Sequence, residues 1–359
     1  MKLLDGGAPD TRPTSIHVVR PPPRPTELTA PPHAAAELEA IWPKRFDLET
    51  LRAMLGDGAD HVLSDVLASR VNAPVWSLAE RGGRRWRPAV SRLAFLVTGG
   101  TPPAPPAIFQ VAELLHTGSL IIDDIQDGAE ERRHGPAAHV TYGVPAALNA
   151  ANTAYFRALE ILRHCLPDRP RLRALDMLAE ELFAAHLGQA LDLALGPRLQ
   201  EMVPSTAHYF VLARAKTGAL VRIAARLGAI SAEADPADET ALGVWASELG
   251  VAYQIHNDLN DLAAGMQDVI GCRPTYPLLL ALEDDGPAAA ALRARLGRPA
   301  LTDSDVRELR RLFARERIAT RGLAAAERAT DRALAALRSL PAVAPRDALE
   351  QMTHDLAGV

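Results

Sequence analysis

Apolar residues recur at helical spacing along almost the whole chain from Phe46 onward. Proline and glycine punctuate this pattern, strand-like alternation is scarce, and alanine, a strong helix former, is abundant. These features predict an all-α fold without a second domain. We expect helices over residues 47–69, 86–98, 107–127, 144–166, 168–195, 206–230, 237–263, 275–284, 303–339 and 345–357.

The first 33 residues differ from the rest of the chain because they are rich in proline. Such a composition favours a disordered tail over a packed helix. The segment also lacks the apolar core of a secretion signal. We therefore divide the chain into a tail, residues 1–33, and one folded domain, residues 34–359.

The predicted helix over residues 107–127 ends in three carboxylates, Asp123, Asp124 and Asp127. Asp123 and Asp127 are four residues apart and share one helix face, where two like charges repel unless a cation lies between them. Carboxylates with open positions for water or phosphate are typical ligands of Mg²⁺. The double arginine that follows would suit an anionic, phosphate-bearing substrate. The segment therefore predicts diphosphate chemistry.

A solvated acidic helix end is the alternative interpretation of such a motif. It fits poorly here, because the residues before Asp123 are almost all apolar. At about 100° per residue, His116 and Ser119 fall in one narrow stripe with Asp123 and Asp127. A buried stripe of this kind needs a bound ligand to balance its charge.

A second acidic cluster lies far along the chain, in the predicted helix over residues 237–263. Its members share a sector of about 100° on a helix and are Gln254, Asn257, Asp258 and Asp261. Two oxygen-rich helix faces could hold a diphosphate between them through several Mg²⁺ ions. Such bridging would neutralise the leaving group and assist its departure.

Further motifs occur in a fixed order between about residues 45 and 285, and together they resemble the trans-isoprenyl diphosphate synthases, the polyprenyl synthetase family. Arginine replaces the family's lysine at positions 84 and 273, in a chain with only three lysines and 36 arginines. The matching elements are Gly82-Gly83-Arg84-Arg85-Trp86-Arg87-Pro88, the aspartates at 123–127, Arg132-Arg133, Gly188-Gln189, Lys216-Thr217-Gly218-Ala219-Leu220 and Asp268-x4-Arg273-x-Thr275-x-Pro277.

The resemblance implies an isoprenoid synthase-type, single-domain bundle of roughly ten or more mostly antiparallel helices around a central cavity. It implies a Mg²⁺-dependent prenyltransferase that condenses an allylic diphosphate with isopentenyl diphosphate to a longer trans-polyprenyl diphosphate. Residues 34–359 would form this catalytic domain, and the chain would form a homodimer. Ser119 and Gly118, four and five positions before Asp123, are small, which implies a product of twenty carbons or longer.

The resemblance also assigns a role to each matched residue. Arg132, Lys216 and Arg273 would hold the allylic diphosphate, and with Asp123 they would assist its departure. The Lys216 carbonyl and the Thr217 hydroxyl would stabilise the allylic cation. The residues that would bind isopentenyl diphosphate are Arg84, Arg87, His116 and Arg133, and Gln254 would also contact substrate. Three Mg²⁺ ions would be held by Asp123, Asp124, Asp127, Asn257, Asp258 and Asp261.

Asn257 departs from the family pattern, which has an aspartate there. An amide offers an oxygen but no charge, so the affinity for the third Mg²⁺ should be lower. The same Asn-Asp-x-x-Asp form occurs in relatives that prenylate an indole or a peptide tryptophan, so an aromatic or peptide acceptor is the main alternative. A terpene cyclase would need serine at Asp261 and glutamate at Gly265. A non-catalytic partner subunit is a further alternative.

Composition indicates which partners and which cellular compartment to expect. The formal net charge of −5 gives no reason to expect a nucleic-acid partner. Two cysteines, Cys165 and Cys272, cannot form a disulfide framework, which favours the reducing cytoplasm. No uninterrupted apolar run approaches the roughly 18 residues that a transmembrane helix needs, so we expect no transmembrane segment.

Overall fold

The longest described helix begins where the sequence supplies a capping residue. The carboxylate of Asp235 accepts a hydrogen bond from the Ala237 amide at 2.8 Å and so caps α12 (Pro236–Ala264). The computed structural model describes residues 34–104, 106–199, 201 and 204–358. The predicted disordered tail, residues 1–33, lies outside the described residues.

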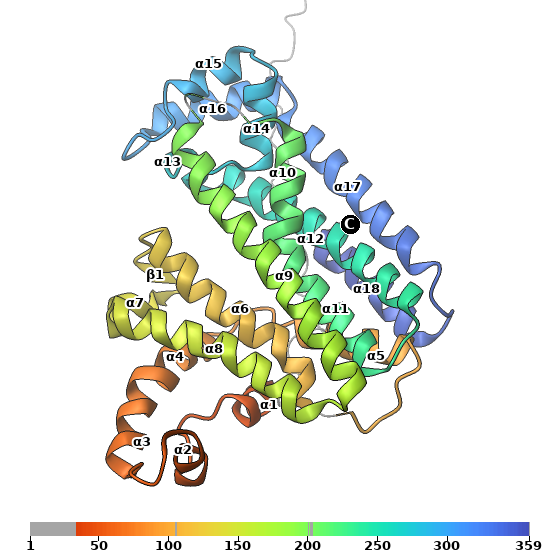
Figure 1. Ribbon diagram of the computed structural model, residues 1–359. Helices are drawn as coiled ribbons and strands as arrows, with labels where there is room; N and C mark the ends of the chain where they lie inside the picture. Colours follow the sequence, from red (N-terminus) through yellow and green to blue (C-terminus); the bar gives the residue numbers. More distant parts are fainter. Residues whose placement is uncertain (1–33, 105, 200, 202–203, 359) are drawn as a thin grey trace, which may run out of the picture.

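The described chain is almost entirely helical, and its longest helices run side by side through the molecule (Figure 1). This confirms the predicted all-α fold. Besides α12, the helices are α1 (Ala34–Ile41), α2 (Leu48–Leu55), α3 (His61–Leu67), α4 (Ala73–Ala79), α5 (Arg87–Val97), α6 (Pro106–Gln126), α7 (Ala138–Tyr142), α8 (Val144–Cys165), α9 (Asp168–Leu195), α10 (Thr206–Ala213), α11 (Ala219–Ser231), α13 (Gln267–Ile270), α14 (Tyr276–Glu283), α15 (Pro287–Arg293), α16 (Asp303–Arg315), α17 (Ile318–Leu337) and α18 (Ala344–Ala357).

Short irregular elements join these helices. A single 3₁₀ turn, η2 (Gly196–Arg198), follows α9, and π-helical turns form η1 (Ala68–Asn72) and η3 (Arg214–Gly218). After α6, strands β1 (Glu131–Arg132) and β2 (Gly135–Pro136) form a small antiparallel hairpin. Each π turn continues directly into an α-helix, α4 after η1 and α11 after η3.

Every predicted helical segment contains a helix, but three segments are divided. The segment 47–69 breaks at Gly56, whose φ of 94° ends α2. The segment 206–230 is interrupted by η3, and 303–339 divides at Arg317, which adopts φ 56° between α16 and α17. Helices α1, α4, α7, α13 and α15 were not predicted, because each is too short to show a clear apolar period.

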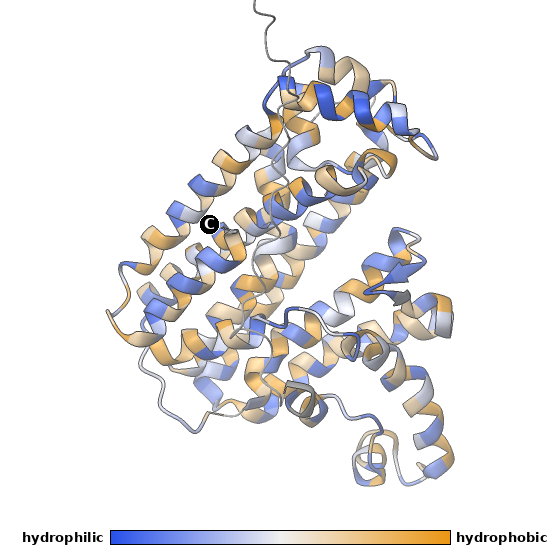
Figure 2. Cartoon of the chain, turned by 180° about the vertical axis from the view of Figure 1, so that it is seen from behind, coloured by the Kyte–Doolittle hydropathy of each residue, from blue (hydrophilic) through white to orange (hydrophobic). Residues whose placement is uncertain are grey.

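Helix α11 lies at the centre of the fold and packs against α5, α6, α9 and α12 (Figure 1). A Cβ at Gly228 would lie 2.2 Å from the Ser91 carbonyl oxygen, so only glycine allows α11 to approach α5 this closely. Seen from behind, hydrophobic and hydrophilic residues alternate along most helices (Figure 2), as expected for amphipathic helices around a shared core. None of the described helices combines the length and hydrophobicity needed to span a lipid bilayer.

Candidate active site

A cavity of about 630 Å³ opens between the C-terminal half of α6 and helices α8, α9, α11 and α12. The loop before α5 and the turn η3 complete its wall. All nine predicted substrate-binding residues line it, and these are Arg84, Arg87, His116, Arg132, Arg133, Lys216, Thr217, Gln254 and Arg273. The metal-binding candidates Asp123 and Asn257 also line this cavity.

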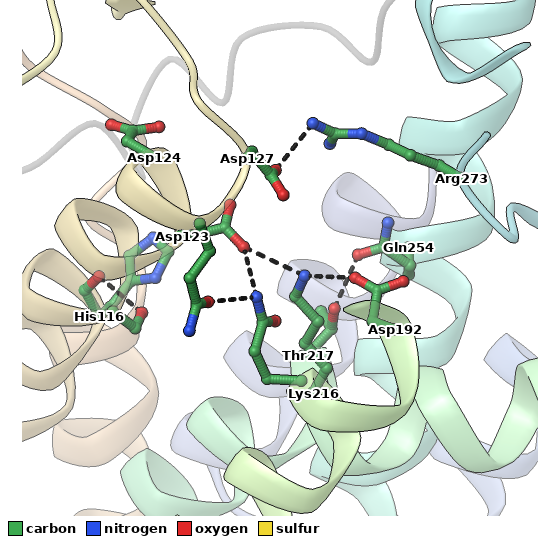
Figure 3. A network of polar contacts seen from close by, with 12 residues as sticks. His116, Asp123, Asp124, Asp127, Asp192, Lys216, Thr217, Gln254 and Arg273 are labelled. Atoms are coloured by element: carbon green, nitrogen blue, oxygen red, sulfur yellow. Dashed lines mark hydrogen bonds and ion pairs between the residues drawn. The ribbon is translucent and has the colours of Figure 1, made fainter. Parts of the chain in front are cut away.

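Asp123 lies in the last turn of α6 and Asp127 directly follows that helix, and each is paired with a cation from a distant part of the chain (Figure 3). Lys216 Nζ lies 3.2 Å from Asp123 Oδ1, and Arg273 Nη2 lies 2.8 Å from Asp127 Oδ2. Burial raises the pKa of Asp127, while the positive charge of Arg273 acts in the opposite direction. The two carboxylates therefore sit in an environment that requires nearby positive charge.

Asp124 points away from this pair (Figure 3) and binds Arg132 of the hairpin instead. Its buried carboxylate accepts a hydrogen bond from Arg132 Nε at 2.7 Å, and Arg132 Nη2 also contacts Asp124 Oδ1. The same guanidinium reaches Asp123 Oδ2 at 3.5 Å. Asp124 thus fixes Arg132 at the cavity edge.

Lys216 occupies the π-helical turn η3, a local deformation that is common at functional sites. Its ammonium donates to Asp192 at 2.7 Å and to Asp123 at 3.2 Å. Burial alone would lower the pKa of Lys216, but the charges of Asp192 and Asp123 outweigh burial and the pKa is raised. Lys216 therefore stays positively charged in the cavity wall.

The neighbouring Thr217 belongs to a chain of hydrogen bonds that leads into α12. Its hydroxyl donates to Gln254 Oε1 at 2.7 Å, and Gln254 Nε2 donates to Asp258 Oδ1 at 2.8 Å. The other oxygen of Asp258 accepts from the Tyr209 hydroxyl at 2.7 Å and the Tyr276 amide at 3.0 Å. Asp258 is 4% exposed, and burial raises its pKa to about 6.

The three candidate metal ligands on α12 therefore have different surroundings. Asn257 is exposed and lines the cavity. Both oxygens of Asp258 already accept hydrogen bonds within the protein. Asp261 accepts from the Asp268 amide at 3.1 Å. Burial, followed by the charge of Asp261, raises the pKa of Asp268 to about 8.

A second basic group faces the cavity from the start of α5 and from the hairpin. Arg87 is buried, its guanidinium lies 4.8 Å from the Trp86 ring centroid, and its Nε has no hydrogen-bond partner within the described residues. Arg133 donates to the Leu78 carbonyl at 3.1 Å and also to the Gly82 carbonyl. A Cβ at Gly83, which has φ 120°, would lie 2.8 Å from Arg133 Nη2, so glycine is needed there.

His116 projects from α6 toward these arginines. Among the described residues its Nδ1 has no hydrogen-bond partner. Burial, and then the positive charges of Arg87, Arg133 and Arg132, lower the pKa of His116 well below its usual value. A neutral imidazole beside buried cations, with an unpaired nitrogen, is suited to bind an anion that supplies the missing partner.

The sequence profile of the family described as Polyprenyl synthetase matches residues 68–313, about two thirds of the chain. This chain belongs to the polyprenyl synthetase family. It is 33% identical over 209 residues to the geranylfarnesyl diphosphate synthase of Aeropyrum pernix, which covers 56% of this chain and 65% of that protein. The first three curated relatives are matched over 54–65% of their own length.

Solved structures of polyprenyl synthetases share the fold. The geranylgeranyl pyrophosphate synthetase from Pyrococcus horikoshii Ot3 superposes with a TM-score of 0.73 at 26% identity, over 80% of this chain and 89% of that chain. The polyprenyl synthase from Caulobacter crescentus CB15, complexed with calcium and isoprenyl diphosphate, gives a TM-score of 0.71 at 28% identity. That match covers 90% of this chain and 95% of that chain.

The donors in this polyprenyl synthetase fit Mg²⁺ that is shared with a bound diphosphate. Among the described residues, no three His, Cys, Asp or Glu side chains converge into a ready-made metal site. Mg²⁺ is usually held by one or two carboxylates together with substrate phosphates and water. Asp123 and Asp127 supply two such carboxylates on one face, and their side chains are 19% and 20% exposed.

Several residues of the site were left out of the predicted set. Gln189 donates to Asp123 at 3.2 Å, and Asp192 binds Lys216. Their three-residue spacing on one predicted helix was a usable signal. Tyr155 and Tyr253 also line the cavity, but each sits in an ordinary apolar helix pattern that marks core positions equally well.

Proposed function

We propose that this protein condenses an allylic diphosphate with isopentenyl diphosphate, in a Mg²⁺-dependent reaction, to a trans-polyprenyl diphosphate of twenty carbons or longer. The observation that carries the proposal is the presence of two separate cationic groups on one cavity. Lys216 and Arg273 lie beside the carboxylates at the end of α6, while Arg87 and Arg133 form the second group in the cavity lining. A reaction that joins two diphosphates needs two such groups.

The pairing of carboxylates with side-chain cations supports a role in leaving-group departure. Lys216 and Arg273 are held in the cavity by Asp192, Asp123 and Asp127. An entering diphosphate can accept hydrogen bonds from both cations, since each carries several donors. When Mg²⁺ is bound by Asp123 and Asp127, it supplies further positive charge to the departing diphosphate.

Thr217 is oriented to stabilise an allylic cation. Its hydroxyl proton is donated to Gln254 at 2.7 Å, so the oxygen lone pairs remain available to positive charge in the cavity. Gln254 is held in place by Asp258, which accepts from its amide nitrogen. The buried Asp258 thus positions Thr217 through Gln254.

Arg87, His116 and Arg84 are suited to the diphosphate of the second substrate. The unpaired Nε of Arg87 and Nδ1 of His116 would gain partners when an anion binds between them. Arg84 lies over the Tyr253 ring at 5.5 Å, which holds its guanidinium near the cavity. The double bond of isopentenyl diphosphate then attacks the allylic cation, and loss of one proton completes the condensation. The released diphosphate is a suitable base for that proton.

Prenyl transfer to an aromatic or peptide acceptor is the second candidate, and Asn257 favours it. This uncharged side chain is exposed in the cavity wall where the family pattern has a charged ligand. In this alternative the allylic diphosphate binds in the same way, but the acceptor carries no diphosphate.

The test is to incubate the purified protein with Mg²⁺, an allylic diphosphate and isopentenyl diphosphate, and to identify the products by mass. Parallel reactions replace isopentenyl diphosphate with indole or a tryptophan-containing peptide. Elongated diphosphates of twenty carbons or more are expected from the first reaction only. A prenylated indole or peptide without chain elongation would instead establish the second candidate.

We further propose that the chain is a cytoplasmic homodimer. Phe183, Leu187 and Leu191 form an apolar stripe on α9 with exposures of 68%, 51% and 44%, and burial against a second copy would remove it from water. Cys165 and Cys272 are unpaired thiols, as suits a reducing compartment. Sedimentation of the parent and of Leu187→Glu tests the assembly, with a dimer expected for the parent and a monomer for the variant.

A further inference from the structure

The π turn η3, which presents Lys216 and Thr217 to the cavity, is bound by an arginine from the helix that follows it. Arg222 lies in the first turn of α11, and its Nη1 donates to the Arg214 carbonyl at 2.8 Å. Gly218 leaves room for this contact, because a Cβ there would lie only 3.0 Å from Arg222 Nη1. Arg222 therefore fixes the backbone at the first residue of the turn.

A buried carboxylate on α9 anchors this arginine. Glu181 Oε2 accepts from Arg222 Nη2 at 2.6 Å, and Glu181 Oε1 accepts from Arg222 Nε at 3.0 Å, a paired geometry that fixes the plane of the guanidinium. The side chains of Glu181 and Arg222 are 7% and 16% exposed. Arg222 Nη1 also donates to Ser247 Oγ of α12 at 3.3 Å. The guanidinium thus joins α9 and α12 to the π turn.

Glu181 has a second partner, which provides a comparison within the same ion-pair network. Arg226 Nη1 donates to Glu181 Oε1 at 2.9 Å, and Arg226 Nε donates to Glu239 of α12 at 3.0 Å. Two arginines of α11 therefore share one carboxylate, but Arg222 extends to the π turn and Arg226 extends to Glu239. Desolvation offsets the attraction within a buried ion pair, so the directional hydrogen bonds of Arg222 matter more for geometry than for stability.

The side chain of Arg214 is held separately from its carbonyl. Glu248 of α12 accepts from Arg214 Nη2 at 2.7 Å, and the other oxygen of Glu248 accepts from Arg332 of α17 at 2.8 Å. Arg222 and Glu248 thus fix two different groups of the residue that begins the turn. Since the backbone at the start of a turn directs the residues that follow, these contacts determine where Lys216 points.

We propose that Arg222, anchored by Glu181, is a positioning residue that holds the π turn in the conformation in which Lys216 and Thr217 face the allylic substrate. The inference rests on the proposed condensation activity, because it assigns Arg222 an effect on the half of the site that binds the allylic diphosphate. Without the bond to the Arg214 carbonyl the turn relaxes, and both side chains lose their place in the cavity wall. Arg222 does not line the cavity and acts through η3.

The first test compares the steady-state kinetics of Arg222→Met and Arg226→Met. The control Arg226→Met removes the other arginine from Glu181 but leaves η3 untouched. Arg222→Met should lower kcat and raise the KM of the allylic diphosphate, each about tenfold, while the KM of isopentenyl diphosphate changes less than about twofold. Arg226→Met, assayed below its melting temperature, should keep all three values within about twofold of the parent. Equal losses in the two variants, or losses shared by both substrates, would indicate a structural role only and overturn the proposal.

Glu181→Gln tests the proposal if Arg222→Met fails to fold. The glutamine keeps the shape of Glu181 and one oxygen acceptor, but it removes the charge that anchors Arg222. The same split between the two substrates is expected, with a smaller loss of about threefold. Kinetic constants equal to those of the parent in Glu181→Gln would overturn the proposal.

A second experiment separates this inference from the proposed activity. Binding of a non-reacting thio analogue of farnesyl diphosphate is measured by calorimetry with Mg²⁺ and without isopentenyl diphosphate. Arg222→Met should bind the analogue about tenfold more weakly than the parent, and Arg226→Met should bind it as the parent does. This loss in a protein that does not elongate would support the inference and reject the activity. Unchanged binding in a protein that elongates would reject the inference and keep the activity, and a parent that does not bind the analogue would overturn both.

Discussion

The ends of α6 and α12 both carry aspartates, four residues apart at the end of α6 and three apart on α12, yet the protein uses them differently. Asp123 and Asp127 are partly exposed and are paired with the mobile-ended side chains of Lys216 and Arg273. Asp258, in contrast, is buried with both oxygens bonded to fixed groups. A carboxylate whose partners are long cationic side chains can exchange them for a ligand, whereas one bonded to amides and buried hydroxyls holds the structure.

The strongest test of this contrast is Asp123→Ala, with Asp127→Ala beside it. Loss of either carboxylate should cost several kcal/mol of transition-state stabilisation, because the transition-state charge is no longer balanced. This corresponds to a fall in kcat/KM on the order of a thousandfold. Steady-state rates measure the effect, and Asp331→Ala on the exposed face of α17 is the control. Rates within about threefold of the parent in both variants would end the argument for a metal clamp on α6.

Asp258→Ala should show the opposite pattern, with its main effect on folding. It leaves the Tyr209 hydroxyl and the Tyr276 amide without their acceptor, at a cost of about 2–4 kcal/mol in the free energy of unfolding. Urea denaturation measures this cost. Asp127→Ala should lose less than about 1 kcal/mol, since its ion pair is with an exposed arginine. Equal losses of unfolding free energy in Asp258→Ala and Asp127→Ala would contradict the proposed difference between the two helix ends.

Arg87→Ala extends the comparison to the opposite wall of the cavity. Truncating a charged phosphate ligand costs about 1.5–3 kcal/mol, roughly tenfold or more in affinity. The Michaelis constant should therefore rise for isopentenyl diphosphate and change little for the allylic substrate. Separate titrations of the two substrates measure this, and equal effects on both would favour an acceptor without a diphosphate.

The smallest expected effect is that of Asn257→Asp. This exposed position lines the cavity, so a carboxylate there should improve Mg²⁺ binding. The Mg²⁺ concentration at half-maximal rate should fall by a few-fold, roughly 0.5–1 kcal/mol. An unchanged or higher requirement would mean that the asparagine serves another purpose, such as contact with a different acceptor.

The sequence was sufficient for the parts of the site that depend on one element. Helix α6 and its carboxylate face follow from local spacing, and both were predicted. The sequence could not show that Asp124 turns to Arg132, because that contact depends on the hairpin and on the left-handed backbone at Arg133 and His134.

The lower wall of the cavity was equally hidden from the sequence. Tyr155 reaches α6 only because Gly118 allows close approach of two helices, and its contact with His186 joins two further elements. The hydrogen bonds to Asp258 likewise depend on Tyr209 and Tyr276, which belong to α10 and α14. Contacts between elements decide which candidate side chains remain available, and spacing along one element does not reveal them.

The π-helical turn at Arg214–Gly218 makes the site sensitive to the number of residues as well as to their identity. A π turn holds one residue more than the α-helical turn it replaces. Deleting Ala215 would let a regular α-helical turn join α10 to α11 with both helices kept in place, because the extra residue of the π turn is the one removed. The widened backbone that presents Lys216 and Thr217 would then be lost, and the two side chains would leave their present positions in the cavity wall. A one-residue deletion that a surface loop would absorb is therefore expected to abolish the site here.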